Sequence, residues 1–397
     1  MIQPTYEGYK AIFANEQFPL AFVDLDVLDQ NIQDILKRAQ GKTIRIASKS
    51  VRIPAILEYI LKKNAQFQGL MCYHPNEAVF LSQQGFDNIL LGYPYIHEKE
   101  ISLILQEVAK GKELIFMVDA LEQIQRIQQI AEKMNVEALI CFDVDMSSDF
   151  GNLHFGVYRS SITSAEKLEE IVKQTSPLSH IQIKGLMGYE AQIAGVNDNV
   201  KGQGIKNAVI QFLKRKSIKE VARKRQEAIA ILKKYGIHQA LVNAGGTGSI
   251  ESSIAEEGVT EVTVGSGFFA SHLFDHYKQF KHLPAAGFAL QITRNPKENI
   301  YTCAGGGYIA SGEVGIVKQP KPYLPTHIKL IKNEGTGEVQ TPIINKSTFN
   351  LKIGDPIFFR HSKAGELFER FDTVYFIREK EIINIQKTIR GFAISTL

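Results

Sequence analysis

One lysine stands almost directly after an apolar segment. The run from Ile44 to Ala47 has the composition of a buried strand, and Lys49 follows it after a single serine. A charged lysine at the end of a core strand is costly to bury. Its pKa is therefore expected to fall, which makes the amine a nucleophile that can form a Schiff base with a carbonyl group. A lysine whose ammonium extends to solvent is the alternative, and spacing alone slightly favours it.

Two glycine-rich turns in the second half of the chain indicate a second kind of chemistry. They are AGGTGS at 244–249 and VGSGFF at 264–269, and each comes after an apolar run. Backbone N–H groups left uncovered by glycine, with the hydroxyls of Thr247 and Ser266, suit the oxygens of a phosphate. Neither turn matches the P-loop pattern, and no G-x-G-x-x-G turn indicates a nicotinamide dinucleotide. Pyridoxal 5'-phosphate (PLP) is a ligand that needs both a reactive lysine and a phosphate site.

Short apolar runs that alternate with helical patterns must position these residues. The runs are too apolar for strands with one solvent face, as expected of parallel strands covered on both sides. Repeated β-α units imply right-handed crossovers, and eight units close a barrel in about 250 residues. We therefore predict an α/β fold with a (β/α)8 TIM barrel whose site lies at the carboxyl ends of the strands. An open doubly wound sheet is the alternative. The nine runs begin at Phe22, Ile44, Gln68, Asn88, Leu114, Ala138, Ile181, Ala240 and Glu261.

One of the nine runs must lie outside an eight-stranded barrel, and the run from Phe22 is our candidate. Pro54 and Pro75 stand at positions that favour the first turn of a helix. An amphipathic helix is predicted from Lys219 to Tyr235. The polar interruption from Ala191 to Lys216 is interpreted either as a lid over the barrel mouth or as a surface insertion. A first helix is predicted from the apolar face formed by Val27, Leu28, Ile32, Ile35, Leu36 and Ala39.

The residue pattern changes after the last apolar run of the predicted barrel. Helical periodicity fades, and β-like segments with glycine and proline turns take over. We predict a barrel domain at 22–272 and a mainly antiparallel β domain at 273–397, which residues 1–21 are expected to join in the fold. The expected β segments are YTCAGGGYIASGEVGIV, PTHIKLI, GDPIFFRHS and DTVYFI.

The composition is that of an ordinary globular protein of 397 residues with a net charge of +4. The basic stretch from Lys201 to Arg225 is interpreted as a solvated helix face, and no nucleic-acid partner is expected. The three cysteines form no C-x-x-C pair, so neither a disulfide framework nor a thiolate zinc site is expected. No apolar stretch approaches a membrane span, and no secretory signal pattern opens the chain. A cytoplasmic location is the default expectation.

Four motifs carry a resemblance that covers most of the chain. They are RIASKSVR at 45–52, HFGVYR at 154–159 after Asp143 and Asp145, GLMGYEA at 185–191, and VNAGGTGS at 242–249 with GSG at 265–267. In this order they resemble the alanine racemase-like, fold type III PLP enzymes, in particular the D-threonine aldolase and D-serine dehydratase branch. The resemblance implies a Schiff base on Lys49. It implies cofactor contacts from Arg45, His154, Tyr189, Gly246, Thr247, Gly248, Gly265 and Ser266.

The chain departs from this family at two places. His154 stands where the family usually has an arginine. In RHSKAGE, at 360–366, His361 matches the first residue of the family's His-x-Asp or His-x-Cys metal pair, but Lys363 takes the second position. We expect the Lys363 ammonium to replace the cation and contact the substrate hydroxyl or carboxylate, without a metal. There are two alternatives. One is a metal held by His361 and Glu366, and the other is a purely structural turn.

The resemblance implies a lyase that acts on a small D-amino acid with a β-hydroxyl, by aldol cleavage or by dehydration. Lys49, His361 and Lys363 are then the catalytic candidates. An amino-acid racemase is one alternative. It would need a second base such as Tyr301 or Tyr308. A non-catalytic PLP-binding protein is another, although such proteins are usually a bare barrel. The family also implies a homodimer, with the amino acid as the small-molecule partner.

Overall fold

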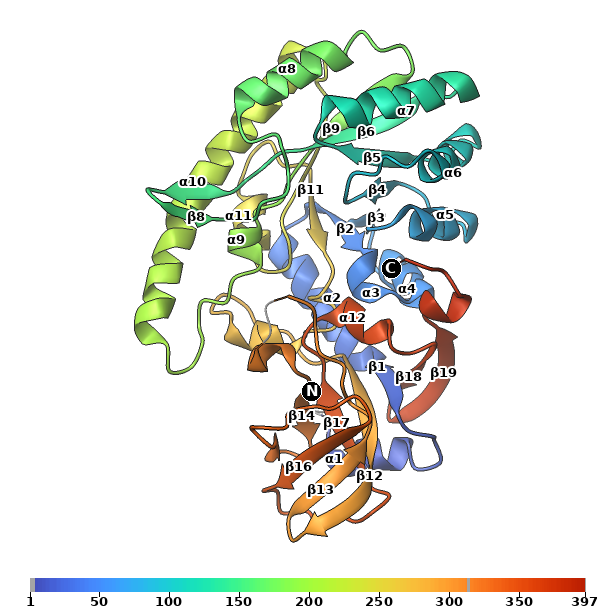
Figure 1. Ribbon diagram of the computed structural model, residues 1–397, viewed down its shortest axis with the longest axis vertical. Coiled ribbons are helices and arrows are strands. Elements are labelled where there is room, and N and C mark those ends of the chain that lie inside the picture. Colours follow the sequence, from blue (N-terminus) through green and yellow to red (C-terminus); the bar gives the residue numbers. More distant parts are fainter. Residues whose placement is uncertain (1–3, 313–314, 397) are drawn as a thin grey trace.

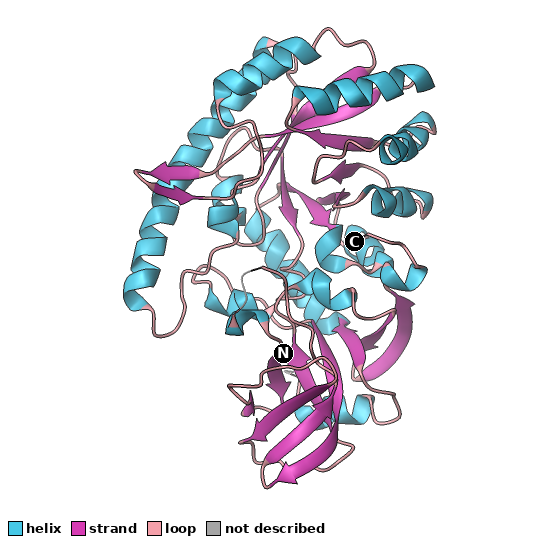
Figure 2. Ribbon diagram, viewed as in Figure 1, coloured by secondary structure: helices cyan, strands magenta, loops and turns pink. Residues whose placement is uncertain are grey.

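The computed structural model describes residues 4–312 and 315–396. A barrel surrounded by helices occupies one end of the molecule, and a β-rich domain occupies the other (Figure 1). Figure 2 shows that the helices gather around the barrel while most of the long strands lie in the second domain. No helix of the described residues is both long and apolar enough to cross a bilayer.

Within the described residues, eight parallel strands close the barrel, so the predicted TIM barrel is confirmed. The open doubly wound alternative is excluded because β11 pairs with β2. The strands are β2 (Thr43–Ala47), β3 (Phe67–Cys72), β4 (Ile89–Leu91), β5 (Leu114–Val118), β6 (Ala138–Asp143), β9 (Ile181–Gly188), β10 (Leu241–Ala244) and β11 (Glu261–Val264).

The helices around the barrel begin where the sequence places their start signals. Asp24 caps α2 by accepting from the backbone N–H groups of Asp26 and Val27, and Pro54 and Pro75 open α4 and α5. The apolar face predicted for α2 is largely buried. The helices are α2 (Leu25–Ala39), α3 (Ser48–Val51), α4 (Pro54–Leu61), α5 (Pro75–Gln83), α6 (Glu98–Ala109), α7 (Leu121–Met134), α8 (Ala165–Thr175), α9 (Ala191–Ala194), α10 (Gly204–Lys234) and α11 (Ile250–Ile254).

The first apolar run lies outside the barrel, as predicted. It forms β1 (Leu20–Asp24), which pairs antiparallel with β12 (Ala286–Lys297) and parallel with β18 (Thr373–Arg378). This strand comes after α1 (Tyr6–Ile12), whose Tyr9 ring packs edge-on against Phe22 and Phe358. The amino-terminal segment therefore contributes to the core of the second domain before the chain enters the barrel.

The second domain is a mainly antiparallel sheet. Among the described residues of the long run predicted from Tyr301, only the start is a strand, because the three glycines after it offer no side chains to pack. That run also includes residues 313–314, which lie outside the described residues. The remaining elements are β13 (Ile300–Ala304), β14 (Lys321–Leu324), β15 (Ile328–Leu330), β16 (Gln340–Asn345), β17 (Pro356–Arg360), α12 (Ala364–Phe368) and β19 (Glu381–Lys387).

The segment after β9 differs from its prediction. Helix α10 begins at Gly204 and not at Lys219, so much of the supposed interruption is helical. Its basic stretch is not uniformly solvated either, because Arg225 and Lys214 are buried. Between β6 and α8 the chain also forms a small hairpin of β7 (Ser148–Phe150) and β8 (Leu153–Phe155), which no sequence signal predicted.

Candidate active site

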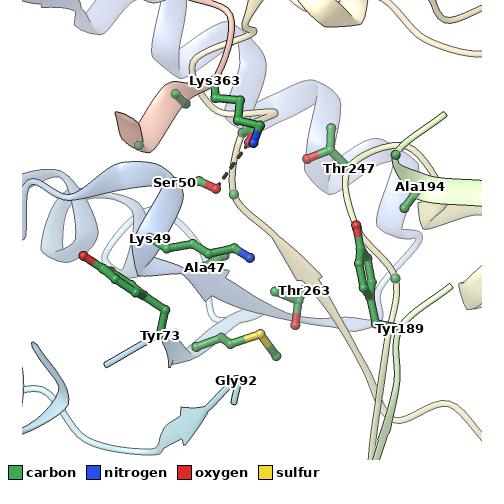
Figure 3. Close-up of a pocket in the computed structure, with 18 of the residues that line it drawn as sticks. Ala47, Lys49, Ser50, Tyr73, Gly92, Tyr189, Ala194, Thr247, Thr263 and Lys363 are labelled. Carbon is green, nitrogen blue, oxygen red and sulfur yellow. Dashed lines mark hydrogen bonds between the residues drawn. The ribbon is translucent and has the colours of Figure 1, made fainter. Parts of the chain in front are cut away.

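A cavity of about 480 Å³ lies at the carboxyl ends of the barrel strands, where a barrel of this kind places its site. One side, which we call the barrel wall, carries Lys49, Tyr189 and the turns at 244–249 and 264–267. The other side, the second-domain wall, is formed by residues 362–366 around the start of α12. Figure 3 shows Lys49 and Lys363 extending from these two walls toward the same space, with Tyr189 and Thr247 across from them.

Lys49 stands in the short helix α3 at the end of β2, and its ammonium reaches the cavity. The Lys49 Nζ atom donates a hydrogen bond to the Tyr93 hydroxyl over 2.6 Å. Burial raises the pKa of Tyr93, but the positive charge of Lys49, their hydrogen bond and Arg159 outweigh burial, so the net pKa lies below its usual value. The pair can therefore hold or exchange a proton at the amine of Lys49.

The two glycine-rich turns meet at the barrel mouth. The Gly267 backbone N–H donates to the Thr247 hydroxyl over 3.0 Å, which joins the turns, and the Ser266 hydroxyl donates to Ser50 over 3.2 Å. A Cβ atom on Gly265 would lie 2.7 Å from the Cβ of Ser50, closer than real Cβ atoms come. Glycine at position 265 therefore lets this turn pack closely against Ala47 and α3, and Gly265 also lines the cavity. A turn without a side chain at the cavity edge suits a phosphate.

The cavity carries more basic than acidic side chains among the described residues that line it. Five are basic, namely Lys49, Arg52, Arg159, Lys318 and Lys363, and three are acidic, namely Asp143, Asp145 and Glu366. Burial, followed by the negative charge of Asp119, raises the pKa of Asp143 to about 7, although Arg159 opposes the shift. Asp143 therefore gives up its proton near neutral pH, which is the range where a carboxyl group can act as a general acid or base. The excess of positive charge favours an anionic ligand.

The second-domain wall is held against Lys49 by close packing. A Cβ atom on Gly365 would lie only 1.6 Å from the carbonyl oxygen of Lys49, so α12 can approach α3 only with glycine there. Next to it, the Lys363 ammonium donates to the Ser311 hydroxyl over 2.9 Å and lies 3.3 Å from the Glu366 carboxylate. Burial raises the pKa of Glu366, but the bonds from Ser311 and the charge of Lys363 outweigh it, so the net pKa is lowered. The wall thus presents a charged pair to the cavity.

The structure brings together six of the predicted site residues in addition to Lys49. Gly248 belongs to the same turn but is covered by Ala194 and Tyr277, so it does not itself line the cavity. The six are Tyr189, Gly246, Thr247, Gly265, Ser266 and Lys363. Burial, followed by the charge of Glu190, raises the pKa of Tyr189 to about 12, so its phenol keeps its proton at neutral pH.

Three other predicted residues lie away from the cavity lining. Arg45 is buried inside the barrel, where its Nε atom lies 2.6 Å from the Glu261 carboxylate. His154 stands on the β7–β8 hairpin, stacked on Tyr158. His361 is buried beside the cavity, and burial, followed by the charge of Arg360, lowers its pKa to about 3. Their predicted roles in cofactor binding and catalysis stay predictions.

Sequence reasoning assigned no role to several residues that line the cavity, among them Arg159, Asp143 and Tyr93. Arg159 closes the HFGVYR motif, Asp143 ends the strand before it, and Tyr93 comes after the apolar run of β4. Asp143 stands at the carboxyl end of a predicted barrel strand, Tyr93 stands just after one, and Arg159 lies in a motif that follows one. That position was the signal that could have found them, because the carboxyl ends of all the strands meet at one face of the barrel.

Residues 23–272 match the family model described as the alanine racemase N-terminal domain. The match covers more than half of the chain, and it includes the barrel and its glycine-rich turns. The chain belongs to the alanine racemase N-terminal domain family. This places it among the fold type III PLP enzymes, and the predicted family is confirmed.

Relatives of this alanine racemase-type chain carry lyase names. A 3-hydroxy-D-aspartate aldolase of Paracoccus denitrificans (strain Pd 1222) is 24% identical over 238 residues, which are 59% of this chain and 55% of that protein. The chain thus spans about half the length of the curated relatives it matches. A D-threonine aldolase from Filomicrobium marinum has a similar fold, with a TM-score of 0.77, 17% identity and coverage of 94% and 95% of the two chains.

Two further solved structures share the two-domain arrangement. The D-threo-3-hydroxyaspartate dehydratase from Delftia sp. HT23 has a TM-score of 0.75 at 14% identity, with 95% of this chain and 98% of that chain covered. An alanine racemase from Clostridium difficile 630 has a TM-score of 0.64 at 16% identity, with 94% and 99% covered. At these identities the likeness shows the fold, including the second β domain.

The residues of the barrel wall fit PLP. They supply an amine at Lys49, a turn without a side chain at Gly265 and an excess of positive charge. The buried Oδ1 atom of Asn243, which also lines the cavity, makes no hydrogen bond within the described residues and can accept one from a ligand. The cavity volume of about 480 Å³ lies in the range of small-molecule sites, which is roughly 300–1,000 Å³.

The segment around His361 does not fit a metal pair. His361 is absent from the cavity lining, and Lys363 offers an ammonium, which has no lone pair for a metal ion. Among residues 4–312 and 315–396, no three His, Cys, Asp or Glu side chains group as metal ligands would. The two tyrosines considered for a racemase are also absent from the cavity lining, since Tyr301 donates to the Leu351 carbonyl and Tyr308 packs against Phe288.

Proposed function

We propose that this protein is a PLP-dependent lyase that acts on a small D-amino acid with a β-hydroxyl group. The observation that carries the proposal is the placement of Lys49 and the glycine-rich turns on one wall of a cavity and of the Lys363–Glu366 pair on the other. The names of the relatives supply the reaction class, since they include aldolases and a dehydratase of hydroxylated D-amino acids.

The barrel wall would hold the cofactor. When bound, PLP supplies an electron sink for bonds broken at the α-carbon of an amino acid. Lys49 would attach the cofactor, while Gly246, Thr247 and Ser266 would receive its phosphate and Tyr189 would lie beside its ring. Tyr93 would keep a proton within reach of the Lys49 amine, which it already contacts over 2.6 Å.

The second-domain wall would hold the substrate. The Lys363 ammonium lies within reach of Ser311 and Glu366 and would contact the β-hydroxyl or a carboxylate of the substrate. Glu366 would orient the ammonium and could accept the hydroxyl proton in an aldol cleavage. This would give glycine and an aldehyde. Loss of the α-proton and the β-hydroxyl as water would instead leave an imine, which water would hydrolyse to a 2-oxo acid and ammonia. The net positive lining favours substrates with a second carboxylate.

Product analysis tests the proposal. The protein with PLP would be incubated with D-threonine, D-serine and 3-hydroxy-D-aspartate, with the L-enantiomers as controls. We expect glycine with an aldehyde, or a 2-oxo acid with ammonia, from at least one D-substrate. Loss of optical rotation on D- or L-alanine or serine without a carbonyl product would identify a racemase. If no amino acid changes the absorbance of the bound cofactor, the protein is a non-catalytic binder.

We further propose that the protein is a homodimer in a reducing compartment such as the cytoplasm. An exposed apolar face on α10 supports the dimer, because Ile205, Val209 and Phe212 are spaced by four and three residues and are 87%, 52% and 49% exposed. The three cysteines are free and buried, as expected in a reducing compartment. Light scattering across a dilution series tests the dimer, and a monomer at every concentration would contradict it.

A further inference from the structure

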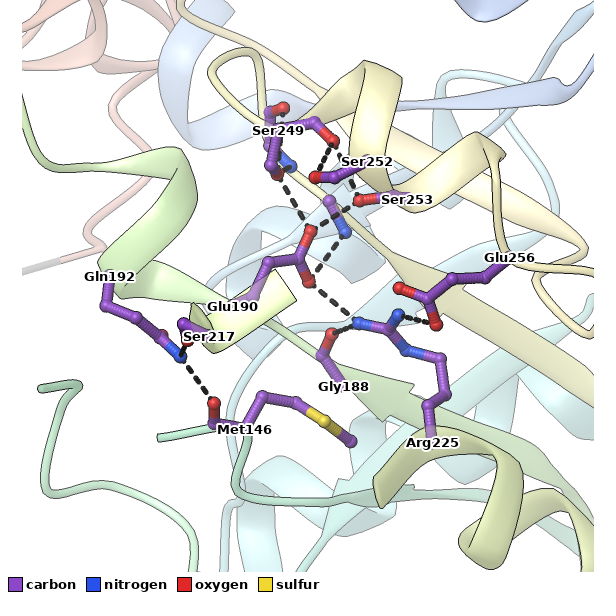
Figure 4. A network of polar contacts seen from close by, with 12 residues as sticks. Met146, Gly188, Glu190, Gln192, Ser217, Arg225, Ser249, Ser252, Ser253 and Glu256 are labelled. Carbon is purple, nitrogen blue, oxygen red and sulfur yellow. Dashed lines mark hydrogen bonds and ion pairs between the residues drawn. The ribbon is translucent and has the colours of Figure 1, made fainter. Parts of the chain in front are cut away.

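A buried ion cluster lies beneath the glycine-rich turn at 244–249 (Figure 4). Arg225 of α10 stands at its centre, between the carboxylates of Glu190 and Glu256. Arg225 is 0% exposed and Glu190 is 1% exposed. Charges buried to this degree persist only where they are paired and hydrogen-bonded, so the cluster has a defined geometry. Arg225 and Glu256 are absent from the cavity lining, so any effect of the cluster on the site is indirect, through the residues that it holds.

Glu190 connects this cluster to the turn. One carboxylate oxygen accepts hydrogen bonds from the hydroxyls of Ser249 and Ser253, over 2.8 and 2.5 Å. The other oxygen accepts from the Gly245 backbone N–H over 3.3 Å and from Arg225 over 2.9 Å. Both ends of the turn are therefore fixed to a single side chain. The Ser249 hydroxyl in turn accepts from the Gly246 backbone N–H over 3.1 Å, which extends the network into the cavity lining.

Arg225 also fixes the chain on both sides of Tyr189. Its Nη2 atom donates to the Gly188 carbonyl over 2.8 Å as well as to the Glu190 carboxylate. Gly188 and Glu190 are the two neighbours of Tyr189 along the chain, so Arg225 restrains the backbone that carries the tyrosine. Because Glu190 is negative, it would repel a nearby phosphate unless Arg225 neutralised it. Arg225 thus both restrains the backbone around Tyr189 and neutralises the charge of Glu190.

We propose that the Glu190–Arg225 ion pair is a positioning device that shapes the turn at 244–249 for the phosphate of the cofactor. It sets the affinity for the phosphorylated cofactor and does not touch the reacting atoms. This inference rests on the proposed function, since it takes the turn to be the phosphate site. Arg225 and Glu190 are positioning residues for that site.

The test compares two ligands that differ only by the phosphate. Equilibrium affinities for PLP and for pyridoxal would be measured by absorbance on the wild type, Glu190→Gln, Arg225→Met and Arg225→Lys. We expect Glu190→Gln and Arg225→Met to weaken PLP binding about tenfold or more, since a hydrogen bond to a charged group is worth about 1.4 kcal/mol or more. Pyridoxal binding should weaken much less, because only the restraint on the backbone around Tyr189 affects that ligand. Arg225→Lys should restore part of the preference. Arg223→Met is the matched control, because its ion pair with Glu227 lies on the exposed face of the same helix.

Each outcome decides the inference. An equal loss for both ligands, or no loss for either, would overturn it. If Arg225→Met does not fold, Ser249→Ala decides, because it removes one bond to Glu190 and leaves both charges in place; it should weaken PLP alone. If the wild type binds pyridoxal as tightly as PLP, the phosphate site of the proposed function is wrong, which is a separate failure.

Discussion

The two walls of the cavity are built in different ways. The barrel wall consists of backbone turns and side chains that are cross-linked to one another, through Gly267 to Thr247 and through Glu190 to Ser249. The second-domain wall presents long charged side chains, Lys363 and Glu366, from the short helix α12 and the turn before it. A fixed wall suits a resident cofactor that must stay in one orientation, whereas a wall of charged ends suits a substrate that enters and leaves.

Of the two departures from the family, His154 lies on the β7–β8 hairpin of the barrel domain and Lys363 lies on the second-domain wall. The motifs around Lys49 and the glycine-rich turns match the family, while Lys363 stands where a metal ligand is expected. The cofactor can therefore be inferred from the barrel, and we propose that the choice of reaction depends on the second-domain wall. Four substitutions test this account, and the expected effect decreases from Lys49 to His361.

Substitution of Lys49 should have the largest effect. Lys49→Ala removes the amine that would attach the cofactor, and we expect product formation to fall by about 10³-fold or more. Lys184→Ala is the control, since Lys184 also stands on a barrel strand but pairs with Glu113 away from the cavity. Steady-state assays measure both variants. Equal losses in the two would mean that Lys49 has no special role.

Substitution of Lys363 should affect the substrate and leave the cofactor alone. We expect Lys363→Ala to lower kcat/KM by about 10- to 100-fold, because a hydrogen bond to a charged group contributes roughly 1.5–3 kcal/mol. PLP affinity should not change, because Lys363 belongs to the other wall. Lys332→Ala, at an exposed position of the second domain, is the control. A fall in PLP affinity that matches the fall in kcat/KM would mean that Lys363 serves the cofactor and not the substrate, which contradicts the separate roles of the two walls.

Asp143 should make stability fall as pH rises toward neutrality. Its pKa of about 7 lies above the ordinary value, so the folded protein binds more protons at this carboxyl than the unfolded chain does. Its stabilising effect is complete below the unfolded pKa and is lost as pH rises through about 7. Relative to wild type, Asp143→Asn should gain about 2–3 kcal/mol of unfolding free energy between about pH 5 and pH 8, at about 1.4 kcal/mol per unit. Urea unfolding of the protein without PLP measures this, and a constant difference would refute the raised pKa.

His361 should give the smallest effect if the ammonium of Lys363 has replaced a metal. Neither ring nitrogen of His361 makes a well-formed hydrogen bond within the described residues, so an apolar side chain of similar size costs little. We expect His361→Leu to change the unfolding free energy by less than about 1 kcal/mol and to keep kcat/KM near wild type. A large loss of activity in His361→Leu, together with activation by manganese or zinc of the wild type but not of the variant, would favour a metal bound at His361.

The sequence was informative where the signal is local. The apolar runs predicted the barrel, the outlying β1 and the strand end that carries Lys49, because burial on both faces leaves a mark in consecutive residues. Arg225 shows the limit of this reasoning. Its neighbours are basic and mostly exposed, so the stretch resembled a solvated face, yet Arg225 itself is buried against Glu190, 35 residues away along the chain. Tyr93 likewise meets Lys49 across 44 residues of the chain, and only the closed barrel brings the two side chains together.

The attachment of the cofactor to Lys49 can be established by chemical labelling of the lysine that carries it. The protein purified with PLP would be reduced with borohydride and digested, and the labelled peptide would be located by mass spectrometry. We predict a single label on Lys49, on the barrel wall, and none in Lys49→Ala. A label on Lys363 or Lys184, or no fixed label in the wild type, would contradict the account.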